Sequence, residues 1–381
     1  MRIACLGYLM PTANGKTPPL RILVVAPVAP SRGGIAQFST MLVNALRAEH
    51  DVTCWAIDPL YPAGLFPGNP RPATVSTLKC RIEARIHGWN PVTWVTAWRT
   101  VRHYDFDIVI WQWWTPYWVP FLLMLVAQAK LRGLATIALN HQLVEPDAPQ
   151  WQALIARMML TRADAVVHFG NSIPMHPMHR NIPLPLHGAL LQCQQTPVNI
   201  RHVLNIPADA YLVLCFGFVR PYKGIDIVLS AMQRTSPQIH LLLAGEWWHN
   251  DPTLRAQCRE STIATRIHVV DHYIPDQDVA AYFAAANVVA LPYRSGSVSG
   301  VATLAASAGI PLLVSAVGAL AGLATVRQVV SPNTPEAWAV ALQQAYEHGT
   351  PPVAPVPDEP SWQALVQTIE NLTASVAGEP R

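Results

Sequence analysis

The sequence is poor in charged residues. Asp, Glu, Lys and Arg make up 13% of its 381 residues, against roughly 25% in an average soluble protein, so we expect a sparsely charged surface. The sequence has no run of about five or six Lys or Arg residues of the kind that marks a nucleic-acid tail. Its net charge of +3 therefore predicts no nucleic-acid partner, and at most a weak attraction to phosphates or to an anionic membrane.

Paired cysteines and long apolar runs are also lacking. The six cysteines, at 5, 54, 80, 193, 215 and 258, include no Cys-x-x-Cys pair, which argues against a zinc site or a disulfide framework. The longest apolar stretch, at 117–127, is shorter than the roughly 20 residues of a membrane-spanning helix, and the apolar run at the N-terminus is too short for a secretory signal. These features predict a cytoplasmic protein with reduced thiols, and a buried or interfacial helix at 117–127.

The chain does contain an alternation of strand-like and helix-like segments. Short apolar runs at 21–30, 51–58, 105–114, 134–141 and 163–170 are separated by helical or loop sequence, and a second series begins near residue 201. Such alternation predicts an α/β protein whose parallel sheets are covered by helices on both faces.

The length and the restart of the alternation together predict two Rossmann-like domains, at 1–200 and 201–349. A proline-rich linker then opens the last segment, 350–381. It leads to a helix whose apolar face carries Trp362, Leu365, Ile369 and Leu372. A helix tethered in this way can reach back to pack on the N-terminal domain.

Two turns between a strand and a helix carry residues suited to phosphate groups. Gly33 and Gly34 stand in SRGGIAQFS, where a ligand can approach the backbone and the free N–H groups of a helix start. Arg220 and Lys223 stand in FGFVRPYKGID, and two cations beside a helix N-terminus suit a diphosphate. A tight turn in the first stretch and solvated surface charges in the second are the alternatives.

A third turn, LPYRSGSVSGVATLAASAG, begins at residue 291 and holds no carboxylate. Ser299, Gly300 and Val301 open its Ala-rich helix, and their N–H groups with the Ser299 hydroxyl could hold a second face of a phosphate. An ordinary N-cap is the alternative.

Three further stretches have less specific patterns. His141 follows a strand and could contact a reacting hydroxyl, although a structural role is common for one of fourteen histidines. Glu246, at the end of IHLLLAGE, could contact a ligand or brace its loop. The tryptophan-rich stretch at 110–118 suits either sugar stacking or core packing.

Taken together, these stretches resemble glycosyltransferase family 4. RGGIAQFS, HQLVEPD, RPYKGIDIVLSA, LLLAGEWW and the block at 271–318 fall in the family's order over residues 21–345. The resemblance implies the GT-B fold, in which two Rossmann-like domains face a central cleft and a C-terminal helix crosses back to the first domain.

The resemblance also implies an activity: the retaining transfer of a sugar from a nucleotide sugar, without a cofactor or a metal. The acceptor would be a glycan or a lipid-linked molecule in polysaccharide or glycolipid synthesis, with peripheral contact at the inner membrane face. The N-terminal domain would lie on the acceptor side, and the C-terminal domain would bind the nucleotide sugar. By this resemblance His141 contacts the transferred sugar, and the diphosphate meets Gly33, Gly34, Arg220 and Lys223.

The chain departs from the usual family pattern at one place. The family has two glutamates separated by seven residues, and alignment on Gly309 and Pro311 puts Gly296 and Leu304 at their positions. The sequence resembles a branch of the family with Ser-Gly-Val at this turn. Glu246 could take over part of the function of the two missing glutamates. A protein of this fold that binds a nucleotide sugar or glycan without turnover is the main alternative function, and a nucleotide-sugar epimerase is a weaker one.

Overall fold

The structure of the chain is a computed structural model. It describes residues 18–59, 78–87, 90–100, 105–143, 149–170, 176–191, 198–248, 251–260, 262–296, 298–318, 320–322, 326–349, 353–357 and 359–378. The N-terminal apolar run and most of the stretch that follows His141 lie outside the described residues.

The chain divides into two compact units. The first comprises Met1–Phe66, Pro70–Pro183 and Glu359–Arg381, and the second comprises Pro67–Asn69 and Leu184–Asp358. The main division thus falls between Pro183 and Leu184, whereas the sequence placed it at 200/201. The last helix belongs to the first unit.

The first unit contains a seven-stranded parallel sheet in the order β3-β2-β1-β4-β5-β6-β7. The strands are β1 (Arg21–Ala26), β2 (Asp51–Ile57), β3 (Ile82–Ile86), β4 (Ile108–Trp113), β5 (Ala135–Asn140), β6 (Ala165–Phe169) and β7 (His179–Ile182). Its helices are α1 (Gly34–Leu46), α2 (Pro91–Thr100), α3 (Val119–Leu131), α4 (Trp151–Leu160) and α11 (Glu359–Gly378), with a 3-10 turn η1 (Pro116–Trp118).

Both faces of this sheet are buried. One face packs against α2, α3 and α4, and its core includes Trp55, Trp111 and Trp113. Trp114 and Trp118 belong to the same core, so core packing is the role of the tryptophan-rich stretch. The segment at 117–127 lies largely in α3, whose inner side is buried. No bilayer-spanning segment is found among the helices in the described part of the chain.

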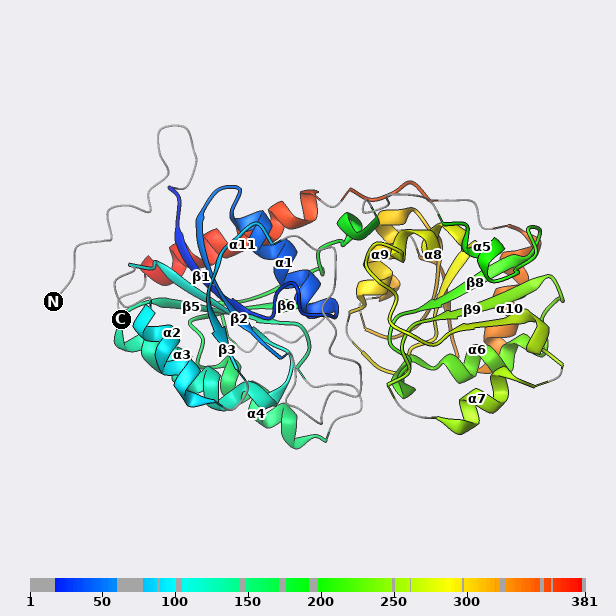
Figure 1. Ribbon diagram of the computed structural model, residues 1–381, viewed down its shortest axis with the longest axis horizontal. Helices are drawn as coiled ribbons and strands as arrows, with labels where there is room; N and C mark the ends of the chain where they lie inside the picture. The colour runs from blue at the N-terminus through cyan, green and yellow to red at the C-terminus, as the bar shows by residue number, and fades with distance from the viewer. Residues whose placement is uncertain are drawn as a thin grey trace. The chain divides into compact units, whose positions relative to one another are not determined.

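Helix α11 packs beside α1 and β5 (Figure 1). The four predicted core residues on its inner face are buried, with Leu365 and Ile369 fully so, and the Trp362 ring lies 5.3 Å from the Phe38 ring of α1. A polar contact adds to this packing: Nε2 of His50 lies 3.3 Å from Oε1 of Glu370. Burial lowers the pKa of His50 and raises the pKa of Glu370, so both shifts favour an uncharged pair.

The second unit contains a six-stranded parallel sheet in the order β10-β9-β8-β11-β12-β13. The strands are β8 (Tyr211–Phe216), β9 (Ile239–Ala244), β10 (Ile267–Val270), β11 (Val288–Leu291), β12 (Leu312–Ser315) and β13 (Val326–Val330). The helices are α5 (Ile200–Val203), α6 (Ile225–Met232), α7 (Pro252–Cys258), α8 (Val279–Ala285), α9 (Gly300–Ala308) and α10 (Pro335–Glu347), and the 3-10 turns are η2 (Gly188–Leu191), η3 (Pro221–Lys223), η4 (Ala264–Arg266) and η5 (Leu320–Gly322).

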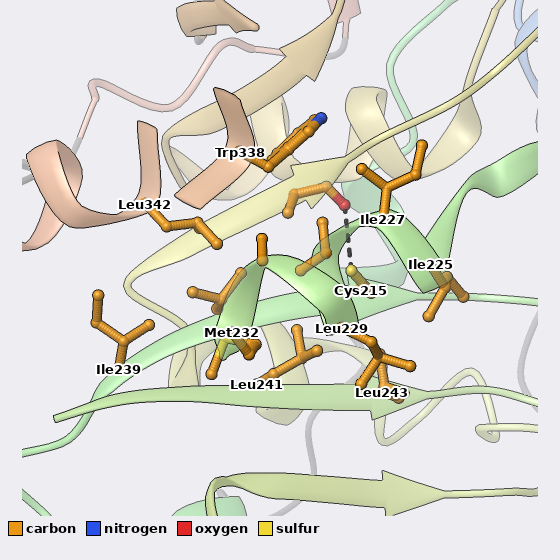
Figure 2. Packing of buried hydrophobic residues seen from close by; sticks show 14 of the residues in the cluster. Cys215, Ile225, Ile227, Leu229, Met232, Ile239, Leu241, Leu243, Trp338 and Leu342 are labelled. Carbon is orange, nitrogen blue, oxygen red and sulfur yellow. Dashed lines mark hydrogen bonds between the residues drawn. The ribbon is translucent and has the colours of Figure 1, made fainter. Parts of the chain in front are cut away.

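One face of the second sheet packs against α6, α7 and α10. Figure 2 shows Leu229 and Met232 of α6 with Leu241 of β9 and Trp338 of α10 in this core. The Trp338 indole is buried and donates to Oδ1 of Asn333 at 2.6 Å. The core is thereby tied to the loop after β11, because Nδ2 of Asn333 donates to the carbonyls of Pro292 and Tyr293 at 3.1 and 3.0 Å.

The two parallel sheets with helices on both faces confirm the predicted α/β class and Rossmann-like architecture. Most strands coincide with the apolar runs in the sequence, but β3, β7 and β13 were not predicted. All three are edge strands, and their burial patterns are mixed. A half-exposed edge strand does not need a continuous apolar run.

Candidate functional site

The ammonium group of Lys223 lies at the carboxyl end of the second sheet, where open α/β sheets bind ligands. The residue is 8% exposed, and its Nζ lies 3.4 Å from the carbonyl oxygen of Phe216, the last residue of β8. Gly217 follows with φ +86°. A Cβ on Gly217 would lie 3.2 Å from Nζ of Lys223 and 3.6 Å from Cγ2 of Val301. The ammonium group and the first turn of α9 therefore both lie next to this glycine.

The surroundings of Lys223 lower the pKa of its ammonium group to about 8. Burial is the main cause, the charge of Arg220 adds to it, and Cys215 opposes it. The ring of Tyr293 has its centroid 6.0 Å from Nζ. A buried cation whose partners among the described residues are one carbonyl oxygen and one aromatic ring favours an anion beside it.

Arg220 begins the turn that carries Lys223. Its guanidinium carbon lies 5.1 Å from the ring centroids of both Tyr222 and Trp248, so two aromatic side chains hold it in place. Arg294 braces the same turn: its Nη1 donates to Oδ1 of Asp226 at 2.8 Å and to the Pro221 carbonyl at 2.8 Å. The predicted pair, Arg220 and Lys223, is therefore brought together on a braced turn.

Glu246 lies next to this turn. Its backbone carbonyl accepts the N–H of Val219 at 2.9 Å, and the N–H of Trp248 donates to the Val219 carbonyl at 3.2 Å. These two bonds align the segment after β9 with the one that leads to Arg220. Gly245 permits this approach, because a Cβ there would lie 2.2 Å from the carbonyl oxygen of Gly217.

Ser299 is the N-cap of α9. Its Oγ accepts the N–H of Ala302 at 3.3 Å and lies 3.0 Å from the hydroxyl of Tyr293. The N-cap role, one of the two alternatives for this serine, is thus observed. Gly300 and Val301 are the first residues of the helix, and N–H groups in the first turn of a helix lack partners within it.

The two positions where the family resemblance places glutamates have different structural reasons for lacking them. Gly296 has φ +129°, a conformation that a residue with a side chain adopts only with strain. Leu304 lies in α9 and is 6% exposed, so it fills apolar space. Neither position can supply a carboxylate to the site.

The first unit holds the other predicted residues. Gly33 is the N-cap of α1 with φ 107°, and Gly34 begins the helix with open space where a Cβ would be. His141 follows β5, is buried, and lies 2.9 Å through Nε2 from Oε1 of Gln112. The predicted residues are therefore grouped by unit: these three in the first, and Arg220, Lys223, Glu246, Ser299, Gly300 and Val301 in the second.

Two Asp-x-Asp triplets, a pattern that can mark a metal site, occur at 105–107 and 276–278. Asp107 precedes β4 and binds Arg21 through Oδ1 at 2.9 Å. Asp276 accepts the hydroxyl of Tyr273 at 2.9 Å. Within the described ranges, neither triplet forms part of a cluster of three His, Cys, Asp or Glu side chains that could hold a metal ion.

Sequence reasoning missed two residues that shape the site. Gly217 was not singled out, although it directly follows β8 and precedes the Arg-Pro-Tyr-Lys turn. Tyr293 was not singled out either, because its hydroxyl contact with Ser299 depends on the folded conformation and leaves no sequence pattern.

Part of the second unit matches a known protein family. Residues 210–348, most of the second unit, match the family described as Glycosyl transferases group 1. A D-inositol 3-phosphate glycosyltransferase from Xylanimonas cellulosilytica is 30% identical over 153 residues, which are 38% of this chain and 36% of that protein. A protein with the same description from Mycobacterium leprae is 32% identical over 127 residues, 32% of this chain and 28% of that protein. The matched stretch thus spans about a third of these relatives.

Solved structures match nearly the whole chain at low identity. Sucrose-phosphate synthase from Thermosynechococcus elongatus has a TM-score of 0.62 at 21% identity, covering 94% of both chains. The catalytic domain of starch synthase IV from Arabidopsis thaliana, bound to ADP and acarbose, has 0.66 at 13% identity, covering 95% of this chain and 100% of that one. HepE from Anabaena in complex with UDP-glucose has 0.63 at 13% identity, covering 94% and 98%. These likenesses show the GT-B fold, and the family match places a glycosyl transferases group 1 domain in the second unit.

The Tyr293–Ser299 contact can be tested by a double-mutant cycle. We expect Ser299→Ala and Tyr293→Phe each to lower the free energy of unfolding by about 1–2 kcal/mol, because each removes a buried hydrogen bond and Ser299→Ala also removes an N-cap. The double variant should lose about 1 kcal/mol less than the sum. Urea denaturation measures all three, and Ser307→Ala, in the same helix, is the control expected to change stability by less than about 0.5 kcal/mol. Strictly additive losses would contradict the bond.

Proposed function

We propose that the protein is a retaining glycosyltransferase that moves a sugar from a nucleotide sugar to a glycan or lipid-linked acceptor in cell-surface polysaccharide or glycolipid synthesis. The observation that carries the proposal is the buried ammonium of Lys223, which meets the start of α9 over Gly217. The family match of residues 210–348 and the curated relatives' description support it. In this proposal the second unit binds the nucleotide sugar, and the first serves the acceptor.

The geometry suits the departure of a diphosphate. When the bond between the sugar and the phosphate oxygen breaks, its electron pair stays on the diphosphate, whose negative charge increases. Lys223 and Arg220 meet this charge with fixed cations, and the N–H groups of Gly300 and Val301 add the positive end of a helix. The acceptor hydroxyl forms the new bond to the sugar and gives up its proton. No metal is required by this scheme.

In this proposal the other predicted residues have the roles that the family resemblance implies for them. Gly33 and Gly34 let the phosphates approach the backbone at the start of α1, where N–H groups are available. His141 contacts the transferred sugar. Glu246 is held beside the Arg220 turn by the Val219 backbone bonds. It takes part of the role of the two glutamates that the family has at the positions of Gly296 and Leu304.

One observation favours a second function. Because Gly296 and Leu304 supply no carboxylate, the site is richer in positive charge than the family pattern, and it could hold a nucleotide sugar without transferring it. Turnover separates the two functions, as the following prediction states.

The transferase proposal predicts turnover of at least one donor. Purified protein, with a panel of nucleotide sugars that includes UDP-glucose and ADP-glucose and with membrane-extract acceptors, should release the nucleoside diphosphate. The rate should be unchanged by EDTA, and NMR of the product should show the anomeric configuration of the donor. Folded protein that binds a nucleotide but turns over no donor would support the binding function instead.

Donor binding should depend on Lys223 and on pH. Lys223→Ala should weaken nucleotide-sugar binding at least about tenfold, measured by calorimetry, because charge-assisted bonds to phosphate are lost. Since the pKa of Lys223 in the empty site is about 8, wild-type affinity should be highest below pH 8 and fall as the pH rises past it, when the ammonium loses its proton. Lys130→Ala, an exposed lysine of the first unit, is the control. Unchanged affinity in Lys223→Ala would remove the diphosphate assignment.

We also propose peripheral contact with an anionic membrane through α4. Trp151 and Leu154 are 55% and 72% exposed, and Met158 is also exposed on the same side of the helix. Arg157 lies exposed among them. Apolar side chains with an adjacent cation suit insertion at the boundary between lipid headgroups and acyl chains.

This contact predicts co-flotation with vesicles that contain anionic lipid. The double variant Trp151→Ser/Leu154→Ser should lose most of the floated fraction, because it removes the largest exposed apolar side chains of α4. The control, Val203→Ser/Val340→Ser, changes two exposed apolar residues of the second unit and should float as the wild type does. Equal flotation of both double variants would argue against α4.

A further inference from the structure

A buried amide, that of Gln112, lies between helix α1 and His141. Gln112 pairs with Leu139 in the register of β4 and β5, and side chains two residues apart on a strand share a face, so Gln112 and His141 lie on one face of the sheet. Oε1 of Gln112 is 2.9 Å from Nε2 of His141 and 3.1 Å from Oγ of Ser39. All three side chains are more than nine-tenths buried.

The hydrogen atoms in this cluster do not match the amide as placed. The Ser39 hydroxyl has one hydrogen, and at 2.6 Å from Oγ stands the Ile35 carbonyl, which can only accept it. The 3.1 Å contact to Gln112 would then join two acceptors. Nε2 of Gln112, a donor of two hydrogens, is buried and has no partner among the residues that the structure describes.

Turning the amide by 180° removes both conflicts. The nitrogen and oxygen of an amide side chain are assigned from their hydrogen bonds and not from their shape. In the turned orientation, Nε2 of Gln112 donates one hydrogen to Ser39 Oγ and the other to Nε2 of His141. The turned orientation leaves only Oε1 of Gln112 without a partner among the described residues, whereas the original orientation leaves both of its N–H groups without one. Buried N–H groups without partners are rarer than buried carbonyl oxygens without partners, so the turned orientation is favoured.

We propose that Gln112 is a positioning residue that donates to Nε2 of His141 and fixes the imidazole in its Nδ1–H tautomer. His141 then offers Nδ1–H as a donor, so the group that it contacts must accept: a sugar hydroxyl oxygen or a phosphate oxygen, and not a hydroxyl hydrogen. The rings of Phe38 and Phe169, at 4.7 and 5.1 Å from the His141 ring, restrict the imidazole further. The catalytic part of this proposal rests on the proposed function, and the tautomer does not.

A second buried histidine on the same sheet provides an internal reference. Nδ2 of Asn140 lies 2.9 Å from Nδ1 of His168, and Nε2 of His168 lies 3.0 Å from Nδ1 of His179. Burial lowers the pKa of His168 to about 4, so its ring is neutral near pH 7. The amide donates to Nδ1 here, and His168 therefore carries its hydrogen on Nε2, the opposite tautomer to that of His141.

Nitrogen-15 NMR of ring-labelled histidines at pH 7.5 tests the tautomers directly, because protonated and bare ring nitrogens have well-separated shifts. The variants His141→Asn and His168→Asn assign the two signals by their loss. We expect Nδ1–H for His141 and Nε2–H for His168 in the wild type. An Nε2–H or doubly protonated His141 would overturn the proposal.

The variant Gln112→Glu should switch the tautomer of His141, because a carboxylate only accepts and draws the hydrogen to Nε2. The spectrum of His168 should stay unchanged and serves as the control for an intact fold. Gln112→Met, of similar size and without hydrogen bonds, should give His141 a mixture of tautomers. An Nδ1–H form that persists in both variants would show that Gln112 does not fix the ring.

Activity completes the test. With a donor that the wild type turns over, both Gln112 variants should lower kcat by about 10-fold or more, because an imidazole in the wrong tautomer loses its hydrogen bond in the transition state, and they should leave the donor KM within about threefold. An unchanged kcat in a variant with the switched tautomer would refute the positioning role. A wild type that turns over no donor would refute the proposed function, whereas the tautomer would still be decided by the spectrum.

Discussion

The burial of a single ammonium group, that of Lys223, is the constraint on which the second unit's site depends. A cation removed from water needs compensation, and among the residues that the structure describes Nζ of Lys223 has one carbonyl oxygen at 3.4 Å and one aromatic ring centroid at 6.0 Å. Burial is the main cause of the lowered pKa of Lys223, and the charge of Arg220 adds to it. Buried charged groups with perturbed pKa values are common at sites that bind a ligand of opposite charge. A diphosphate has the negative charge to pair with Lys223.

The rest of the second unit holds this cation in place. Gly217 leaves room for Nζ, the Arg294–Asp226 pair braces the turn, and Asn333 ties the loop after β11 to the core through Trp338. The start of α9 comes to the same place because Ser299 caps the helix and contacts Tyr293. The absent carboxylates fit this arrangement, since Gly296 has a backbone conformation suited to glycine and Leu304 is buried. The turn before α9 therefore folds without these carboxylates.

Much of the fold could be predicted from the sequence, and the failures have a physical cause. Strands buried on both faces read as continuous apolar runs, so β4, β5, β8 and β9 were found. The edge strands β3, β7 and β13 carry polar residues such as Glu83, Arg180 and Gln328 and gave no such signal. Turns next to strand ends pointed to Lys223 and Ser299. The bond of Gln112 to His141 could not be found, because it depends on the register between two strands and on hydrogen positions.

Titration of the Lys223 side chain shows whether this buried ammonium group binds a diphosphate. The chain has only four lysines, Lys16, Lys79, Lys130 and Lys223, so carbon-13 lysine labelling gives a spectrum in which Lys223 is assigned by its loss in Lys223→Arg. We expect a midpoint near pH 8 in the empty protein and a higher midpoint when a nucleoside diphosphate is bound. A midpoint near the ordinary lysine value of about 10.4 that does not respond to the nucleotide would contradict this expectation.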